Sequence, residues 1–373
     1  FFNTRNILTL GIGRIWESIE ATRYDDKMKY HTDYAFVQYE WQPLEKLNVL
    51  TGARFDKHSA YGSQLSPKLS LQYDVTAWLA VRASAGVGFK ASDFRQLYLN
   101  FTNSTVGYSV LGSRVVSDEI TKLQQEGQID QILAEPSTFG DINAESSVAY
   151  NLGVMLKADK LPSLSINVFR NDVKDLIDTK AVARKVNGQY VYSYYNISKV
   201  FTEGIEMETA YQLTRNINLA VGYQLLIAKD KEEVKNIRDG KVYARNPETN
   251  ITYRVSPDDY GGLFNRSKHM LNAKIFYNDL QHGWNATARF IYRGRYGFAD
   301  ANSSTVLDDD REYVNGYATC NLSVAKSFGD IFRMQVGCDN VFDYKDPVYI
   351  PMLPGRRLWA SLSLTLSKKN NPN

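Results

Sequence analysis

The sequence predicts an all-β protein, a transmembrane antiparallel β-barrel, on three observations. Apolar and polar residues alternate with period two in about fourteen segments, so that each segment has one apolar and one polar face. Each segment is about 9–11 residues long, which is enough for a tilted strand to cross a bilayer. The connections alternate between short and long, as in barrels with short turns at one end and long loops at the other.

The segment from residue 79 to 90 illustrates the alternation. Leu79, Val81 and Phe89 fall on one face, whereas Arg82 and Lys90 fall on the other. Charges on the second face favour a wide, wet or plugged lumen, because a small barrel would have to bury them. We expect strands at 6–16, 33–42, 47–57, 65–74, 79–90, 147–158, 163–174, 203–212, 217–227, 268–278, 283–293, 315–326, 331–341 and 356–366.

We interpret residues 1–373 as a single β-barrel domain. The predicted long, extracellular loops are about 17–32, 91–146, 175–202, 228–267, 294–314 and 342–355, with 58–64 as a brief member of the set. The loop that starts at residue 91 contains a polar stretch, Ser117–Gln131, that could form a short helix. An even number of strands places both ends of the chain on the short-turn side, which is the periplasm in a bacterial outer membrane.

The composition excludes several other classes. The net charge is only +3 and the basic residues are scattered, so nothing predicts nucleic-acid binding. No run approaches ~18 apolar residues, so no transmembrane helix is predicted. Aromatic residues make up 13% of the chain and gather at strand ends, as Tyr39, Trp41 and Tyr292 do, which is typical of the aromatic girdles of membrane barrels.

A soluble sandwich or propeller is the alternative fold. A sandwich would favour tight turns on both sides of its strands, and propeller blades repeat at about 40–45 residues with a signature that is absent here. The regular short and long connections and the charged second face argue against both.

Five stretches resemble the sequence boxes of TonB-dependent receptors, in the family's order. They read GFKASDFRQLYLNF, GDINAESSVAYNLGV, SINVFRNDVKDLI, YYNISKVFTEGIEMETAYQL and GCDNVFDYKDPVYIPMLPGRRLWASLSLTL. The residues that match the boxes are Asn143, Glu145, Ser146, Tyr150, Leu152, Gly153, Asn196, Gly204, Glu206, Asn340, Phe342, Asp343, Tyr349, Gly355 and Arg356. The first two boxes are most similar to haem and haemoglobin receptors of Bacteroides-type bacteria.

The resemblance implies a barrel of about 22 strands, of which this chain would be the C-terminal part, with the plug domain outside it. It implies the TonB complex of the inner membrane as a partner through that plug region, together with outer-membrane lipids and a candidate surface lipoprotein. The first box departs from the family because Ser92 stands where the family has Pro and Lys90 replaces Arg. Residues 91–142 contain no His, which haem receptors usually carry there.

Candidate ligand-binding residues lie in the long loops. Phe94, Arg95, Tyr98 and Tyr108 could form a lid with aromatic contacts to a large planar ligand, or could fold the loop onto its neighbours. His31, His58 and His269 are predicted near the extracellular ends of strands, where a neutral imidazole could bind a haem iron, although surface histidines are more often only solvated.

Two further groups are weaker candidates. Asp308, Asp309 and Asp310 form a carboxylate cluster that could bind Ca²⁺, although the spacing is not that of an EF-hand and a solvated acidic loop is the simpler interpretation. Cys320 and Cys338 are equidistant from Gly329, so an in-register hairpin would place them face to face on the lipid side as a candidate disulfide. Two cysteines rule out a disulfide framework.

No catalytic triad, phosphate loop or zinc spacing is present in the sequence, so we expect a protein that is not an enzyme and has no intrinsic cofactor. The predicted function is TonB-dependent import of a scarce nutrient across the outer membrane, foremost an iron chelate such as haem. A cobalamin or siderophore receptor of the same family is one alternative. A self-contained porin or hydrophobic-substrate channel of about fourteen strands is the other.

Overall fold

The computed structural model is dominated by one large antiparallel sheet. It describes residues 6–24, 27–60, 62–103, 108–158, 161–246, 248–298, 300, 302, 304, 306–329, 331–347, 349–350 and 353–365. Within these residues the main sheet has 17 strands, of which three, β6–β8, are short strands inside one loop. The other fourteen agree in number and place with the predicted strands.

The long strands follow one another as a meander. They are β1 (Asn6–Ile19), β2 (Met28–Leu44), β3 (Leu47–His58), β4 (Gly62–Asp74), β5 (Leu79–Lys90), β9 (Glu145–Leu156), β10 (Ser163–Lys185), β11 (Tyr190–Gln212), β12 (Ile217–Asp230), β15 (His269–Asp279), β16 (Trp284–Arg293), β19 (Tyr317–Phe328), β20 (Phe332–Asp339) and β21 (Arg357–Leu364). Each pairs antiparallel with the next in this order.

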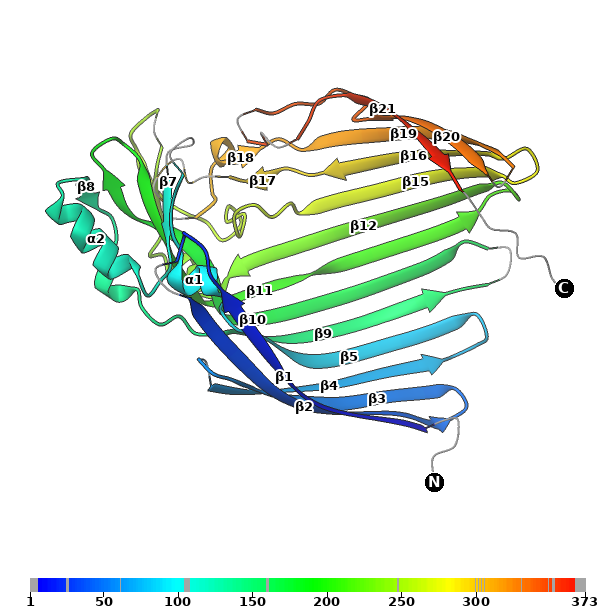
Figure 1. Cartoon of the computed structure of the whole chain (residues 1–373), viewed down its shortest axis with the longest axis horizontal. Helices are drawn as coiled ribbons and strands as arrows, with labels where there is room; N and C mark the ends of the chain where they lie inside the picture. Colours follow the sequence, from blue (N-terminus) through cyan, green and yellow to red (C-terminus); the bar gives the residue numbers. More distant parts are fainter. Residues whose placement is uncertain are drawn as a thin grey trace.

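The sheet is strongly curved and open (Figure 1). Among the described residues, β1 pairs only with β2 and β21 only with β20. β1 begins and β21 ends at the end of the sheet that carries the short turns, as predicted. An open sheet of this kind agrees with part of a larger barrel and argues against the alternative of a closed fourteen-stranded porin.

The two faces of the sheet differ in chemistry. On the outer face apolar side chains such as Ile275 and Leu322 remain 50% and 42% exposed, since no protein layer covers them. On the inner face polar side chains bond to one another along and across the strands: Arg82 Nε donates to Gln72 Oε1 at 2.8 Å, and Gln224 Nε2 donates to Glu206 Oε1 at 3.0 Å. This segregation follows from the period-two alternation of the sequence.

The β10–β11 hairpin corrects one predicted loop. We predict a loop at 175–202, but β10 continues to Lys185 and β11 begins at Tyr190, so this segment is nearly all strand. Its polar residues break the apolar alternation without breaking the backbone pairing, because a strand that has left the membrane no longer needs an apolar face.

The loop 91–146 is folded onto this extension. It contains α1 (Phe94–Tyr98), β6 (Asn100–Asn103), β7 (Tyr108–Leu111), α2 (Val116–Gln125), β8 (Ile129–Ile132) and η1 (Pro136–Thr138), so the predicted helix is confirmed as α2. β7 runs parallel to β11 and β8 antiparallel to β10. Val116 and Ile120 of α2 are buried against Val182 and Val191, which closes a separate hydrophobic core.

The loops 228–267 and 294–314 share a second core. They contain α3 (Lys231–Arg238), β13 (Tyr243–Arg245), β14 (Thr252–Arg254), β17 (Tyr296–Gly297), η2 (Asp310–Glu312) and β18 (Tyr313–Val314). Val306 from the second loop packs with Ile237, Val255 and Tyr260 from the first. The two loops are therefore joined into one unit at the long-loop end.

In the part of the chain that the structure describes, no helix combines the length and the apolar character needed to cross a membrane.

Candidate functional site

The short helix α1 places aromatic and cationic side chains at the long-loop end of the sheet. Asp93 caps it, because its Oδ1 accepts from the Gln96 backbone N–H at 2.8 Å while Gln96 Oε1 accepts from the Asp93 N–H at 3.0 Å. The side chain of Leu97 is fully buried and anchors α1 to the rest of the protein. α1 packs against β7, which follows it in the same loop, and against β11, which is separated from β5 by β9 and β10.

An aromatic stack forms where α1 meets the end of β2. The Tyr30 ring stacks on Phe94 with centroids 4.4 Å apart and an interplanar angle of 11°. His58 meets the same tyrosine edge-on at 5.0 Å, and Tyr98 lies 6.4 Å away. Two of the predicted ligand-binding residues, Phe94 and Tyr98, are thus brought together with His58, around a tyrosine that the sequence did not single out.

Tyrosines from opposite parts of the sheet approach the same helix. Burial raises the pKa of Tyr24, on the β1–β2 loop, and the nearby Asp93 carboxylate raises it further. Burial likewise raises the pKa of Tyr194, on the β11 extension, while the positive charge of Arg95 works against that shift. Both phenols therefore lie within electrostatic reach of the α1 cap. We call Tyr24, Tyr30, Phe94, Arg95, Tyr98, Arg114 and Tyr194 the mouth cluster.

Arg114 fastens the cluster to the rest of its loop. Its guanidinium donates to Tyr98 Oη and, at 2.6 Å, to the carboxylate of Asp141. Burial opposes the charge of Arg114, yet the two hydrogen bonds raise its pKa above the ordinary value. Arg95 differs, because its side chain is 60% exposed and pairs with the exposed Asp93 at 3.3 Å. Arg95 is thus the cation of the cluster that is open to a ligand.

Tyr108, the remaining predicted aromatic, lies beside the cluster. Its ring is 6.4 Å from that of Phe101, which is itself covered by the Arg23 guanidinium at 4.4 Å. Tyr108 is therefore close to the rim but outside the Tyr30 stack.

The three predicted histidines do not converge. His58 is only 6% exposed, and its Nδ1 accepts from the Ala60 N–H at 3.0 Å. His31 is half-buried on the neighbouring strand, with its backbone N–H donating to Ser59 Oγ. His269 is exposed on β15, across the sheet from the other two, where its Nδ1 and Tyr223 Oη are 2.8 Å apart.

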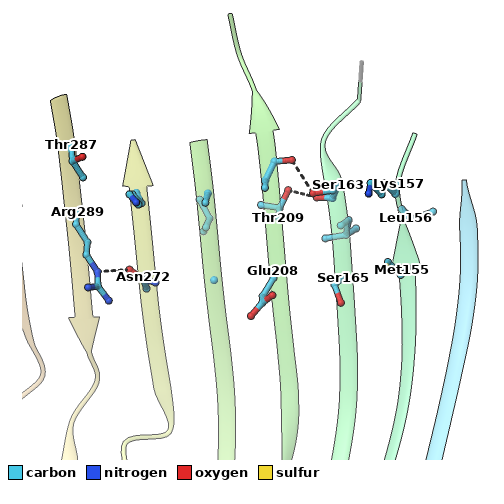
Figure 2. A pocket seen from close by; sticks show the side chains of 16 residues that line it. Met155, Leu156, Lys157, Ser163, Ser165, Glu208, Thr209, Asn272, Thr287 and Arg289 are labelled. Carbon is cyan, nitrogen blue, oxygen red and sulfur yellow. Dashed lines mark hydrogen bonds between the residues drawn. The ribbon is translucent and has the colours of Figure 1, made fainter. Parts of the chain in front are cut away.

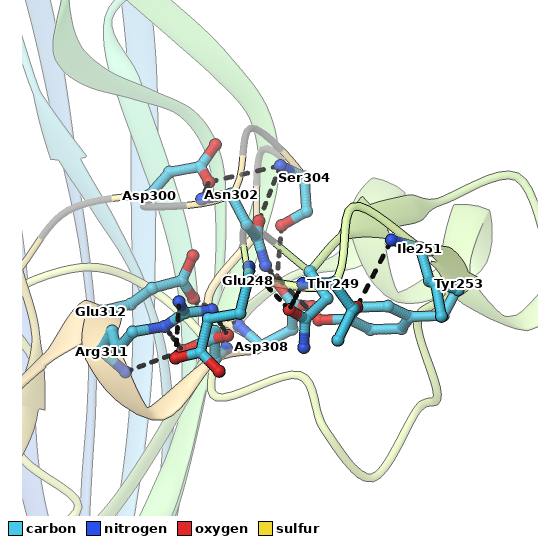
Figure 3. A network of polar contacts seen from close by, with 12 residues as sticks. Glu248, Thr249, Ile251, Tyr253, Asp300, Asn302, Ser304, Asp308, Arg311 and Glu312 are labelled. Carbon is cyan, nitrogen blue, oxygen red and sulfur yellow. Dashed lines mark hydrogen bonds and ion pairs between the residues drawn. The ribbon is translucent and has the colours of Figure 1, made fainter.

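Asp308 takes part in a polar joint between the loops 228–267 and 294–314 (Figure 3). Asp308 accepts from Tyr253 Oη at 3.0 Å and from Ser304 Oγ at 2.6 Å. Asp309 pairs with Arg311, whose hydrogen bonds lower the pKa of that carboxyl to about 2, and Asp310 meets Arg295. Burial and then the Asp308 contact raise the pKa of Tyr253 to about 12.

Each of these three carboxylates has a hydrogen-bond or ion-pair partner on the protein, and the Ca²⁺ site stays a prediction. Across the described residues, no group of three or more His, Cys, Asp and Glu side chains is arranged to hold a metal ion.

The prediction that Cys320 faces Cys338 is wrong. Phe328 pairs with Phe332, so the centre of the hairpin lies one residue beyond Gly329. Each residue of β19 therefore pairs with a residue two positions further along β20 than the predicted register gives. Cys338 consequently lies opposite Leu322, and both cysteines are free thiols.

The residues that carry the family resemblance have structural partners. Asn196 accepts from the Asn143 N–H at 2.7 Å and donates to the Asp175 carbonyl at 2.7 Å, where the chain adopts a left-handed φ of 56°. Asn340 is buried and donates to the carbonyls of Tyr344 and Pro354, which closes the last long loop. The side chains of these boxes therefore form hydrogen bonds that fix the backbone at the ends of the long loops. Because their role is structural, these boxes predict the fold better than they predict the ligand.

The inner face contains a broad hollow near the short-turn ends of β9 and β10 (Figure 2). It has a volume of about 840 Å³ and runs across β9, β10, β11, β12, β15 and β16. Charged side chains from well-separated strands line it, among them Lys157, Glu208, Lys274 and Arg289. Arg289 Nε donates to Asn272 Oδ1 at 3.2 Å. Such a surface suits a hydrated path or a polar domain packed inside a barrel.

Comparison with known proteins supports the architecture. The model of the family described as "TonB dependent receptor-like, beta-barrel" matches residues 3–341. The iron-regulated outer membrane virulence protein of Vibrio cholerae is 21% identical over 96% of this chain and 49% of its own length. A probable TonB-dependent siderophore receptor, PirA of Acinetobacter baumannii, is 23% identical over 90% of this chain and 43% of its own length.

Solved structures agree in fold. The siderophore receptor PirA from Pseudomonas aeruginosa superposes with a TM-score of 0.62 and 16% identity, covering 96% of this chain and 51% of the receptor. This chain thus spans about half the length of the relatives that it matches.

Proposed function

Because this chain belongs to the family of TonB-dependent receptor-like β-barrels, we propose that its receptor captures an anionic ferric chelate at the mouth cluster and imports it through the barrel. The chain is an outer-membrane protein and not an enzyme, like the receptors that it resembles. The relatives' names favour iron as the cargo, since one is iron-regulated and another is a probable siderophore receptor.

The mouth cluster is the observation that carries the proposal. It combines the stacked rings of Tyr30 and Phe94 with the exposed guanidinium of Arg95. Guanidinium groups recognise anionic oxygen pairs, and they also stack on aromatic planes. A chelate with anionic oxygens and planar aromatic groups would satisfy both features, as catecholate siderophores do.

The arrangement favours a siderophore over haem. Haem capture through an axial histidine needs an imidazole nitrogen free to reach the iron. His58 is buried under Tyr30, and His269 lies on β15, across the sheet from the mouth cluster. The anionic chelate needs no such ligand, because the chelator supplies the iron coordination itself.

Import would proceed from the long-loop end to the short-turn end. The long loops would face outside and the chelate would pass along the charged inner face, once the TonB complex acts on a plug region. The work would come from the inner membrane through the TonB complex, as membership of the TonB-dependent receptor family implies.

Binding of a ferric catecholate siderophore and of haem to the purified full-length receptor tests the proposal. Arg95→Gln should weaken siderophore binding about tenfold or more, because it removes one charge-assisted contact. Arg245→Gln, at an exposed arginine of β13, is the matched control and should leave affinity unchanged. Equal affinity of the Arg95 variant and the wild type would overturn the proposal. A haem Soret shift that disappears on substituting His31 or His58 would replace it with haem capture.

A further inference from the structure

A second cavity lies at the long-loop end, on the opposite side of the sheet from the lumen. It has a volume of about 430 Å³ and is enclosed by the upper ends of β11 and β12, by α3 and by residues 257–268. Its apolar floor includes Phe201, Ile227 and Ile237.

Strand register identifies the face on which this cavity opens. Lys229 pairs with Phe201, and Ile227 pairs with Glu203, so these four side chains point to one side. Glu203 also pairs with Arg170, two residues along β10 from Val168, which is 50% exposed on the outer, apolar face. The alternate residues of β11 and β12, such as Glu206 and Gln224, belong to the polar inner face. The cavity is therefore on the outer face.

The cavity carries an excess of positive charge. Lys229, Arg238, Arg266 and Lys268 line it, against only Glu203 and Asp258. Glu203 is already engaged, since Arg170 donates to it at 2.7 Å. Within the described residues, Lys229, Arg238 and Lys268 form no ion pair. Burial lowers the pKa of Lys229, which lies in the predicted loop above the membrane span. The charges of Lys268 and Arg238 lower it further, and the carboxylates of Asp258 and Glu203 act in the opposite direction. An anion would relieve this repulsion.

The depth of the cavity matches that of lipid headgroups. Along the outer face of β12 the side chains are Leu219, Val221, Tyr223, Leu225, Ile227 and then Lys229. Consecutive outward side chains are about 7 Å apart, so Lys229 lies one step above the apolar run. Tyr150 lies on the same face and is level with Ile227, through the pairings of Tyr150 with Arg170, of Arg170 with Glu203 and of Glu203 with Ile227. Aromatic residues at such a level mark the membrane boundary.

We propose that this cavity binds the phosphate-bearing headgroup of an outer-leaflet lipid. Four cations against two carboxylates in the lining favour a phosphate as the occupant. The apolar face below accommodates the acyl chains. The transported nutrient is a poor occupant, because the cavity lies on the outer face of the sheet. This inference does not depend on the identity of the transported ligand.

Native mass spectrometry of the purified full-length receptor in detergent would test the site. The probes are diphosphorylated lipid A, its dephosphorylated form and inorganic phosphate. The variant is Lys229→Gln with Lys268→Gln, and the control is Lys274→Gln, which removes a cation from the inner face of β15. Thermal unfolding of each variant confirms that it is folded.

Diphosphorylated lipid A should bind the wild type and the control alike, and bind the double variant about tenfold or more weakly, because each surface cation contributes appreciably to anionic lipid binding. The dephosphorylated lipid should not distinguish the three proteins. Equal lipid A affinity for the wild type and the double variant would overturn the inference. Displacement of lipid A by millimolar inorganic phosphate would overturn the lipid assignment and leave a site for free phosphate.

Discussion

The membrane strands and the loops at one end of them bury their apolar side chains against different partners. Ile275 of β15 remains 50% exposed because only lipid or detergent covers it, whereas Ile120 of α2 is fully buried among protein side chains. The hydrophobic cores of this chain lie outside the membrane span, in the loops. The membrane strands are stabilised by backbone hydrogen bonds and by contact of their apolar side chains with lipid. The folded loops are stabilised by the burial of apolar side chains against other protein side chains.

The largest effect should come from opening a loop core. Ile120→Ala should destabilise the folded loop 91–146 by about 2–5 kcal/mol, because it leaves a cavity that protein cannot fill. Hydrogen exchange of residues 116–132 should rise while the barrel strands remain protected. Ile275→Ala makes the same chemical change on the outer face and should cost much less, since lipid fills the space. Equal losses of stability from Ile120→Ala and Ile275→Ala would contradict the idea that the loops and the membrane strands bury their apolar side chains against different partners.

Close strand packing gives the next effect. A side chain at Gly204 would overlap the Leu225 carbonyl and crowd the Phe169 ring, so Gly204→Ala should cost about 1–3 kcal/mol in the barrel. Nothing lies within 4 Å of a Cβ at Gly222, on the adjacent strand, so Gly222→Ala is the control. Denaturant unfolding monitored by the heat-modifiable gel mobility of the barrel would measure both. If Gly204→Ala leaves the stability of the barrel unchanged, the backbone of β11 and β12 can shift to accommodate the added methyl group, and the prediction is wrong.

The polar joint between loops should contribute less. Tyr253→Phe removes the hydroxyl that donates to Asp308 at 3.0 Å and should weaken the contact between loops 228–267 and 294–314 by about 1.5 kcal/mol. Limited proteolysis within residues 306–314 should quicken several-fold. Tyr243→Phe, at an exposed tyrosine of the same loop, should leave the cleavage rate unchanged. No change at Tyr253 would mean that the shared core alone joins the loops.

The smallest effect should depend on pH. The Arg311 contact lowers the pKa of Asp309 to about 2, so this pair stabilises the loop fully above the unfolded value of 3.8 and loses its contribution as the pH falls from about 4 through 2. Pepsin should therefore cleave the loop 294–314 faster at pH 2 than at pH 4, after correction for pepsin activity on an unstructured peptide. Asp309→Asn should abolish this dependence. Asp310→Asn should preserve it, because that carboxylate is 90% exposed. A wild-type loop with no such pH dependence would show that the pair contributes nothing.

The predicted ligand residues show the limits of local reasoning. Phe94, Arg95 and Tyr98 share one helical turn, so their proximity to one another followed from the chain itself. Their partners Tyr30, Tyr194 and Arg114 come from a strand end, a hairpin extension and another part of the loop. No spacing in the sequence connects these positions. The outer cationic cavity was missed for the same reason, because its cations are scattered among ordinary surface charges.

The sequence by itself determined the strands of the sheet and their two faces, because alternation with period two is a local property that each strand carries alone. It also determined which strands pair across the short turns, since a short turn places the two strands that it joins side by side. Only the tertiary structure decided how far β10 and β11 extend, that Cys338 lies opposite Leu322, and that Asp308–Asp310 bond to the protein. Polar and charged side chains form hydrogen bonds and ion pairs with whichever groups lie close in space. In the loops, those groups come from parts of the chain that no sequence periodicity connects.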